Sequence, residues 1–414
     1  MGLTSPPVGS PRQSGAPAMI DPAAAARLVP ALAATANSGV RVYRYTHPST
    51  GWRLSIATHA EPGSQKLSLG GFRIAPEERT SVPGFDSDRE AIGLAIGMEE
   101  KVYWSRLIGV GGPLAQRDRH RIVGGKCVLH PTPQARVGQP HDFEMLDFAI
   151  ACFEDVETRY GFSLATGQDL GHGLMSDGRT QSLEYLNSRF SGSVVADTSR
   201  PTGEGNYHVL AGMLRAMDVA IERSTVGLIG CGNVGMHVIR RLHDDGAAML
   251  AVEANEGRRE ALAALGIPTF EPSEKREFLR RPMDAVVVNA AGGSLDPQAI
   301  ARIVANERIK VVCGSENLAM PEEAAGSDAL RRAHTAYAPT ELGGMMGYLA
   351  AVEEYLARAE GMPFEVRTLF AAARKLESAA YEATRYARER NFSIGFEDAM
   401  REVSGRGTSQ SPTG

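Results

Sequence analysis

Aromatic residues and cysteines are few in this chain, and it has no long hydrophobic run. The four cysteines lie far apart without a Cys-x-x-Cys pair, which argues against a metal site or a disulfide framework and favours a reducing, cytoplasmic setting. A membrane span needs about 18 consecutive apolar residues, which the sequence lacks. The net charge of -5 gives no reason to expect a nucleic acid or an anionic membrane as partner. These absences favour a small molecule as the partner.

The length and composition are those of a globular α/β protein with two domains. The chain has 414 residues, more than one hydrophobic core usually serves, with 43% hydrophobic and 22% charged residues. Residues 1–20 are rich in Pro, Gly and Ser and lack the pattern of a signal peptide, so we expect a disordered arm. A disordered tail is expected over 404–414 for the same reason.

The segment 21–200 combines strands and helices without a phosphate-binding motif and is expected to form one domain. A strand is predicted over 52–58. A helix is predicted over 87–103, because its start has the spacing of a capping box. Apolar residues at helical spacing predict a second helix over 143–160, which Gly161 would end.

From Ser224 onward, short runs of Val, Ile and Leu alternate with helical segments, which is the pattern of βαβ units and a parallel sheet. We therefore predict a Rossmann domain over 201–346. The remaining sequence is helical in pattern, notably over 363–390, and we expect helices in 347–403 to pack back on the first domain or between subunits. The predicted strands are 225–229, 248–252, 285–288, 310–313 and 336–338.

A Gly-x-Gly-x-x-Gly turn follows the first of these strands and opens a helix. One glycine permits the tight turn, the second lets the backbone approach a pyrophosphate, and the third lets the helix pack on the strand. N–H groups at the helix start also favour phosphate. The motif alone is weak evidence, but its strand–turn–helix setting predicts a dinucleotide site. Its residues are Gly230, Gly232 and Gly235, with Asn233 and Val234 at the helix start.

Glu253 ends the next strand and favours NAD as the cofactor. It follows Gly230 by 253 − 230 = 23 residues, close to the spacing of the acidic residue that hydrogen-bonds the adenosine ribose. A carboxylate there would repel the 2′-phosphate of NADP, although Arg258 and Arg259 nearby could soften that preference. The alternative is that Glu253 is an ordinary solvated residue at a strand end.

Motifs in both predicted domains resemble the Glu/Leu/Phe/Val amino-acid dehydrogenase family, and more closely its leucine and phenylalanine branch. The resemblance runs from about Gly51 to Arg390 and rests on the order of several motifs. They are Leu69-Gly70-Gly71-Phe72-Arg73, Gly97-Met98-Glu99-Glu100-Lys101, Val123-Gly124-Gly125-Lys126, Thr166-Gly167-Gln168-Asp169-Leu170-Gly171, Asn289-Ala290-Ala291-Gly292 and Gly314-Ser315-Glu316-Asn317.

The resemblance implies NAD-dependent oxidative deamination of an L-amino acid, or the reverse reductive amination of a 2-oxo acid, by a homo-oligomer. It assigns the substrate carboxylate to Lys101 with the backbone at Gly70 and Gly71. Lys126, with a pKa lowered by burial and a neighbouring cation, would be the base for the attacking water. Asp169 would exchange protons with the amine. The nicotinamide ribose would contact Ala290 and Asn317.

Each of these residues also has a structural interpretation. Lysines are common on surfaces, so Lys101 and Lys126 could simply be solvated. Asp169 could be a turn residue, and Gly70 with Gly71 could form only a bend. Their joint order ahead of a dinucleotide motif favours the functional interpretation.

The sequence departs from the family at three places. Between Lys101 and Lys126 the chain is longer than in leucine-type enzymes, so 110–121 is interpreted as an insertion near the active site. Gly205 stands where the family has a threonine that contacts the nicotinamide amide. Gly344 stands where the family has an asparagine that helps hold the substrate carboxylate, and this loss should change substrate choice or weaken turnover.

The pocket for the substrate side chain is expected to be wide. Gly167 leaves volume beside the substrate, which makes bulky substrates plausible. Met345 and Met346 could line such a pocket, although methionine pairs more often fill a core.

Two rival functions remain open from the sequence. One is a related enzyme that acts on another amine or imine, and the other is a catalytically silent dinucleotide-binding homologue. A 2-hydroxy-acid dehydrogenase is disfavoured, because no histidine lies in a convincing catalytic motif.

Overall fold

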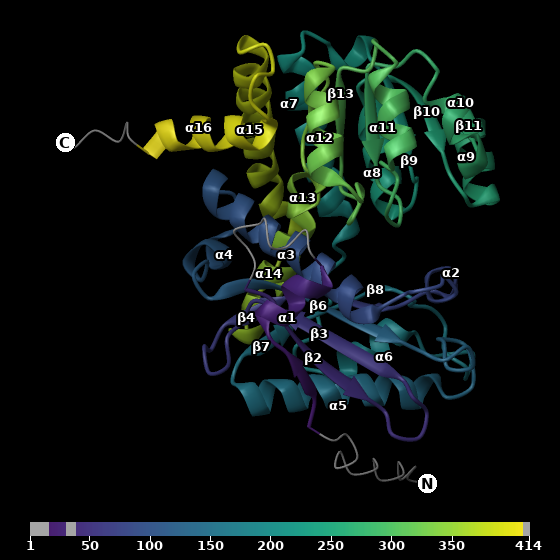
Figure 1. Cartoon of the computed structure of the whole chain (residues 1–414), viewed down its shortest axis with the longest axis vertical. Helices are drawn as coiled ribbons and strands as arrows, with labels where there is room; N and C mark the ends of the chain where they lie inside the picture. The colour runs from purple at the N-terminus through teal and green to yellow at the C-terminus, as the bar shows by residue number, and fades with distance from the viewer. Residues whose placement is uncertain (1–15, 30–38, 409–414) are drawn as a thin grey trace. The chain divides into compact units, whose positions relative to one another are not determined.

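The computed structural model describes residues 16–29 and 39–408, which divide into two compact units (Figure 1). Unit 1 takes the described residues up to Glu99 together with His120–Val195. Unit 2 takes Glu100–Arg119 and the described residues from Ala196 onward. The mixed α/β architecture confirms the expected fold class.

Unit 1 is built on a mixed sheet. Its strands follow the order β1-β2-β3-β6-β4-β7, and β5 pairs with both β6 and β8. The pairs β1–β2, β2–β3 and β3–β6 are antiparallel, whereas the pairs made by β4 and β5 are parallel. The strands are β1 (Ala18–Ile20), β2 (Arg41–Thr46), β3 (Arg53–Thr58), β4 (Leu67–Leu69), β5 (Phe72–Ile74), β6 (Ile122–His130), β7 (Ser163–Ala165) and β8 (Gln168–Leu170).

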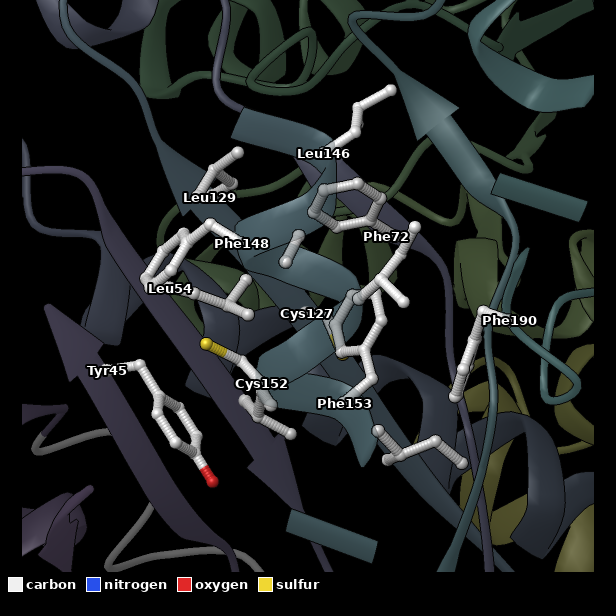
Figure 2. Packing of buried hydrophobic residues seen from close by; sticks show 14 of the residues in the cluster. Tyr45, Leu54, Phe72, Cys127, Leu129, Leu146, Phe148, Cys152, Phe153 and Phe190 are labelled. Carbon is white, nitrogen blue, oxygen red and sulfur yellow. The ribbon is translucent and has the colours of Figure 1, made fainter. Parts of the chain in front are cut away.

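Helices cover both faces of this sheet. Figure 2 shows Phe148 and Phe153 of one helix packed against Leu54, Phe72 and other sheet residues, which form the main hydrophobic core of unit 1. On the opposite face a smaller apolar cluster joins the sheet to the helix that begins at Ser87. The helices are α1 (Pro22–Leu28), α2 (Glu77–Thr80), α3 (Ser87–Ile108), α5 (Asp142–Tyr160) and α6 (Ser182–Arg189).

Unit 2 contains a six-stranded parallel sheet with the order β11-β10-β9-β12-β13-β14. Numbered within the unit, this is the order 3-2-1-4-5-6 of a doubly wound dinucleotide fold, in which ligands bind where the order reverses. The predicted Rossmann strands are confirmed to within one residue at their ends. They are β9 (Thr225–Ile229), β10 (Ala248–Val252), β12 (Ala285–Val288), β13 (Val311–Gly314) and β14 (Ala336–Tyr337), and β11 (Thr269–Phe270) adds an edge.

The apolar side chains of α10, α11 and α12 pack on one face of the parallel sheet. Helix α7 contacts strand β13 of the same sheet. Every helix within 16–29 and 39–408 is too short or too polar to cross a membrane. The helices of unit 2 are α4 (Pro113–Arg117), α7 (Ser199–Ala216), α8 (Asn233–Asp244), α9 (Glu256–Ala264), α10 (Lys275–Phe278), α11 (Pro297–Val304), α12 (Glu323–Arg332), α13 (Thr340–Gly343), α14 (Met345–Ala359), α15 (Phe370–Glu389) and α16 (Phe396–Thr408).

The C-terminal helices fall in unit 2 with the dinucleotide fold, whereas the sequence led us to expect helices of 347–403 on the first domain or between subunits. The physical reason is a close crossing of α15 and α7. A Cβ added to Gly212 would lie 2.2 Å from the Glu377 carbonyl oxygen, and His208 Nδ1 lies 3.0 Å from the Glu377 carboxylate. A glycine at the crossing thus brings the two backbones together.

The insertion at 110–121 also lies mostly in unit 2. Its helix α4 begins against α14, where Glu353 accepts hydrogen bonds from the backbone N–H groups of Leu114 and Ala115 at 2.9 and 2.8 Å. A buried carboxylate therefore caps the start of α4 and holds this segment to the helices that follow the dinucleotide fold.

Three smaller expectations change. Residues 18–20 form β1 and pair with β2, so this part of the predicted arm is ordered, while 1–15 lie outside the described residues. The predicted tail begins inside α16, and 409–414 lie outside the described residues. The cap of α3 is Asp86, whose side chain accepts from the Asp88 N–H at 2.8 Å, rather than Ser87.

Candidate active site

Two glycines precede Lys126 on strand β6, and neither position has room for a side chain. A Cβ at Gly124 would lie 2.3 Å from the backbone nitrogen of Glu99 on α3, and one at Gly125 would lie 2.2 Å from the Ser68 hydroxyl on β4. The run Val-Gly-Gly-Lys therefore lets α3 and β4 approach the strand closely. This packing fixes the position of Lys126.

Lys126 and Asp169 form an ion pair beside Gly71. Lys126 Nζ donates a hydrogen bond to Asp169 Oδ2, and the Lys126 side chain is only 4% exposed whereas that of Asp169 is 30% exposed. A Cβ on Gly71 would lie 2.7 Å from Lys126 Nζ and 3.2 Å from Asp169 Cβ. The strand β5, which pairs with both β6 and β8, thus brings three of the sequence motifs together.

Arg73 is a second cation beside this pair, although sequence reasoning gave it no role. Its Nη2 lies 3.6 Å from Asp169 Oδ2, and its Nη1 donates to Glu90 at 2.6 Å. Glu90 accepts a further hydrogen bond from Arg79 at 3.0 Å. We call Lys126, Asp169, Arg73 and Glu90 the charged cluster of unit 1.

The charged cluster shifts the pKa values of its own members. Burial lowers the pKa of Lys126 below the ordinary lysine value; the Asp169 carboxylate opposes this shift and the Arg73 guanidinium adds to it. Burial alone would raise the pKa of Asp169, but the charges of Lys126 and Arg73 outweigh it and hold that pKa below its ordinary value. Asp169 Oδ1 is buried and has no hydrogen-bond partner in the described part of the chain. Such an acceptor suits a ligand that donates a hydrogen bond.

The two glycines expected to bind the substrate carboxylate differ in what their backbones offer. The Gly70 N–H donates to the Ala165 carbonyl at 3.1 Å, so it serves the sheet. Gly71 lies against Lys126 and Asp169. Of the two glycines, Gly71 is the one that lies beside the charged cluster.

Lys101 lies in unit 2 at a buried position on α3, with 7% of the residue exposed. Its Nζ donates a hydrogen bond to Asn317 Oδ1 at 3.1 Å. The structural alternative of a solvated Lys101 is therefore wrong, and so is that of a solvated Lys126.

The glycine turn of unit 2 has the geometry of a phosphate cradle. Gly230 has φ +87°, and a Cβ there would lie 2.6 Å from the Ala290 backbone. A Cβ at Gly235 would lie 2.3 Å from the Gly230 carbonyl, so the helix packs on the turn itself. At Gly232 a Cβ would meet nothing closer than the Arg258 guanidinium at 3.7 Å. The first and third glycines therefore shape the fold, and the second leaves the start of α8, with Asn233 and Val234, open to a phosphate.

Glu253 is buried, which corrects the alternative of a solvated strand end. One carboxylate oxygen accepts from the Cys231 N–H at 2.7 Å and the other from the Asn255 N–H at 2.8 Å. These bonds fix the carboxylate beside the glycine turn. Each oxygen retains a second lone pair with which it can accept a hydrogen bond from a hydroxyl group.

The loop after β12 supplies neutral polar groups at the carboxyl end of the parallel strands, where the glycine turn also lies. Glu316 accepts from the backbone N–H groups of Ala290 and Ser294 at 2.9 and 2.8 Å and so fixes the loop. Asn206 on α7 donates to Asn289 Oδ1 at 2.7 Å. Within the described residues, Asn206 Oδ1 and Asn289 Nδ2 are buried without partners. One acceptor and one donor together complement a carboxamide, as the nicotinamide carries.

Asn206 and Glu316 were missed as site residues by the sequence reasoning. Asn206 is the neighbour of Gly205, where the family has its threonine. A side chain larger than hydrogen at Gly205 would meet Met346 Cγ at 2.6 Å, so Met346 fills that place. The next residue along α7, Asn206, carries a buried amide.

The expected wide pocket is not formed at Gly167. A Cβ there would lie 3.1 Å from the Val194 carbonyl oxygen and 3.3 Å from its Cβ, so Val194 occupies the space. Met345 and Met346 are fully buried and are core residues.

The parallel sheet with its glycine turn, and the separate unit with a buried lysine–aspartate pair, define a two-domain architecture that contains a doubly wound dinucleotide fold. Solved structures share this fold. The L-tryptophan dehydrogenase from Nostoc punctiforme matches with a TM-score of 0.59 and 18% identity over 88% of this chain and 94% of that chain. A glutamate dehydrogenase from Plasmodium falciparum matches with a TM-score of 0.59 and 14% identity over 90% of this chain and 81% of that one.

Sequence similarity points to the same group of proteins. Leucine dehydrogenase from Bacillus cereus is 27% identical over 148 residues, which are 34% of this chain and 38% of that protein. Leucine dehydrogenase from Geobacillus stearothermophilus is 28% identical over a match of the same extent. No family model matches the sequence. The fold and this partial match confirm the resemblance to amino-acid dehydrogenases that the sequence motifs indicated.

Proposed function

We propose that the chain is a divergent amino-acid dehydrogenase that couples NAD to the oxidative deamination of an L-amino acid, or to its reverse. The charged cluster of unit 1 carries this proposal, because it buries a lysine of lowered pKa against an aspartate with an unpartnered oxygen. The fold and the partial match to leucine dehydrogenase support it.

Proton transfer falls to Lys126 and Asp169 in this proposal. A lysine whose pKa is lowered is neutral in a larger fraction of molecules near neutral pH, and a neutral amine can take a proton from the attacking water. Asp169 holds that amine through Oδ2 and presents Oδ1 to the substrate nitrogen. Arg73 keeps Asp169 ionised and disfavours a proton on Lys126.

NAD fits the residues of unit 2. The start of α8 at Gly232 would hold the pyrophosphate, Glu253 the ribose hydroxyls, and Asn206 with Asn289 the carboxamide. When bound, the nicotinamide supplies the hydride acceptor for the α-carbon. The buried carboxylate of Glu253 favours NAD, because it would repel a phosphate on the ribose.

A second candidate is oxidation of an amine without the usual carboxylate contacts. The substitution of the family asparagine by Gly344 favours it, since a site that has lost a hydrogen bond discriminates less. Substrates that lack a carboxylate would then turn over at rates similar to those of amino acids.

A substrate screen tests the proposal. Purified protein is incubated with NAD and a panel of aliphatic and aromatic L-amino acids and amines, and in reverse with NADH, ammonia and 2-oxo acids, while NADH is followed by absorbance. We expect turnover with amino acids and their oxo acids. Turnover of amines at rates similar to those of amino acids would establish the second candidate. NADH binding without turnover of any substrate would identify a silent homologue.

A further inference from the structure

Two arginines follow each other near the start of α9, and the structure gives them different surroundings. Arg259 Nη1 donates to the carbonyl oxygens of Glu253 and Ala254 at 3.0 and 2.7 Å. Its Nη2 donates to Glu271 Oε1 at 3.2 Å. Arg259 therefore fixes the end of β10 to the segment after β11 and is occupied as a structural residue.

Arg258 has no such ties. Its side chain is exposed, and its Nη1 lies 3.7 Å from the place that a Cβ on Gly232 would take. Its backbone N–H donates to Asn255, the cap of α9, so the helix start is held without the guanidinium. Within the described residues, the guanidinium has neither an ion pair nor a hydrogen bond. A cation without a partner thus stands over the second glycine of the turn.

This second glycine is where a phosphate would reach the backbone. Gly232 is the N-cap of α8, whose first turn carries no acidic residue. The Glu253 carboxylate is directed to the backbone N–H groups of Cys231 and Asn255, so it does not take up the guanidinium. A pyrophosphate on the N–H groups of the helix start would therefore meet Arg258 with its charge uncompensated.

The charge of Arg258 acts on the turn itself. Burial and the Glu253 charge raise the pKa of the Cys231 thiol to about 12, whereas the Arg258 charge acts in the lowering direction. A guanidinium bonds phosphate oxygens through a planar fork, and such charge-assisted bonds are about twice as strong as neutral ones. Arg258 thus adds a charged donor to the neutral N–H groups of the turn.

We propose that Arg258 binds the pyrophosphate of the nicotinamide dinucleotide at the glycine turn. This inference rests on the proposed function, and it adds a side chain to a cradle otherwise built of backbone. It also separates two arginines that the sequence could not tell apart. The pyrophosphate is common to NAD and NADP, so Arg258 raises the affinity for both and leaves the choice between them to Glu253.

Four variants of the full-length protein test the assignment. They are Arg258→Lys, Arg258→Ala, Arg258→Glu, and Arg240→Ala as the matched control. Arg240 is an exposed arginine further along α8, about 10 Å from Asn233 by the helical rise. Its loss changes the net charge as much as the loss of Arg258 does. For each variant the Kd of NADH and the Kd of NADPH are measured by fluorescence.

We expect the Kd of NADH to rise in the order Arg258→Lys, Arg258→Ala, Arg258→Glu. The rise should be about tenfold for alanine, as the loss of a bond to a charged group gives. Lysine keeps the charge but not the fork, and glutamate repels the phosphates. Arg240→Ala should bind NADH like the unaltered protein. Any other order, or an equal rise in Arg240→Ala, overturns the inference.

Two further readouts identify the part of the dinucleotide that Arg258 contacts. Arg258→Ala should weaken the binding of NADPH and NADH by the same factor. A loss confined to NADPH would place the guanidinium on the 2′-phosphate and overturn the inference. Added sodium chloride should weaken NADH binding more in the unaltered protein than in Arg258→Ala, because it screens the ionic contact. An equal salt effect would indicate contact with the adenine ring and overturn the inference as well.

Binding without turnover separates this inference from the proposed function. A Kd of NADH that depends on Arg258, in a protein that turns over no amino acid, supports the inference while the proposed function fails. Turnover of amino acids with the same Kd of NADH in Arg258→Ala and the unaltered protein rejects the inference and leaves the proposed function intact. No NADH binding to the unaltered protein rejects both.

Discussion

The two units carry their candidate site residues in opposite ways. Unit 1 buries charges against one another, with Lys126, Asp169 and Arg73 within one cluster. Unit 2 presents glycine backbone and neutral amides. Its buried carboxylates Glu253 and Glu316 accept hydrogen bonds from backbone N–H groups. The difference follows from the tasks proposed for them. Proton transfer needs a shifted pKa, which burial and neighbouring charges create, whereas a cofactor needs close backbone approach and paired donors and acceptors.

The largest effect is expected at the lysine of the charged cluster. Lys126→Ala should lower kcat about a thousandfold, within the range that a positioned general base contributes, while NADH binding stays unchanged. Lys66→Ala is the control, since Lys66 in the same unit donates to the His120 carbonyl at 2.7 Å at an exposed site. Steady-state kinetics and NADH fluorescence check both variants. Equal kcat values for Lys126→Ala and the unaltered protein would remove the base assignment.

Unit 2 also has a buried charged group around Glu204. A variant of Glu204 tests whether burial of charge by itself marks a catalytic site. Glu204 on α7 lies 2.9 Å from His237 Nε2 and 3.4 Å from His208 Nε2, and it accepts from Arg241. Glu204→Gln should lower the free energy of unfolding by about 3 kcal/mol, because it leaves buried partners uncompensated, with little change in kcat. Urea denaturation measures the loss, with the exposed Glu222→Gln as control.

The pH dependence of that loss has a definite sign. Burial opposes ionisation of Glu204, but its bonds to His208, His237 and Arg241 hold its pKa well below the ordinary value. The carboxylate therefore adds stability above the unfolded pKa, about 4.3, and this addition disappears as the pH falls through the folded pKa. The gap between Glu204→Gln and the unaltered protein should be full at pH 7 and shrink in acid. A gap that is constant with pH would contradict an ionic origin.

A smaller effect is expected at the open glycine of the cofactor turn. Gly232→Ala places its methyl group in ordinary contact with the Arg258 guanidinium at 3.7 Å and against nothing closer, so the unfolding free energy should stay within about 0.5 kcal/mol of the unaltered protein. The pyrophosphate then meets the methyl group, and the Kd of NADH should rise about tenfold. Gly395→Ala lies outside the motif at a position without a positive φ, where a Cβ would meet nothing within 4 Å, and it controls for loss of glycine. Unchanged NADH affinity in Gly232→Ala would argue against this cradle.

The smallest expected effect is a shift of the pH profile, with opposite signs for the two neighbours of Lys126. Arg73→Gln removes a cation, so the pKa of Lys126 should rise and the acid limb of kcat/KM for deamination should move up by about one pH unit. Asp169→Asn removes an anion and should move the limb down in whatever activity remains. Arg73→Lys keeps the charge and should leave the limb in place. Shifts of the same sign in Arg73→Gln and Asp169→Asn would contradict the cluster.

The sequence predicted unit 2 better than unit 1 for a physical reason. The strands β9, β10 and β12 are buried on both faces and show as continuous apolar runs with a glycine turn between them. In unit 1 the strands β4, β5, β7 and β8 have three residues each, which is too few for a pattern to show. Their pairing depends on contacts distant in sequence, such as β5 with β6.

The same limit applied to the site. Lys126, Asp169 and the glycine turn stand in recognisable motifs and were predicted by residue. Glu90 looked like a helix-start residue, and only the fold brings it to Arg73. Asn206 gave no signal apart from its place beside Gly205. The grouping of the C-terminal helices depended on the crossing at Gly212, which no local pattern announces.

The substrate screen with Lys126→Ala alongside the unaltered protein tests the central claim most directly. The account predicts NADH formation from NAD and at least one L-amino acid, its reversal with the 2-oxo acid and ammonia, and a rate about a thousandfold lower in the variant. NADH binding with no turnover in either direction, or turnover in Lys126→Ala at the rate of the unaltered protein, would contradict the account.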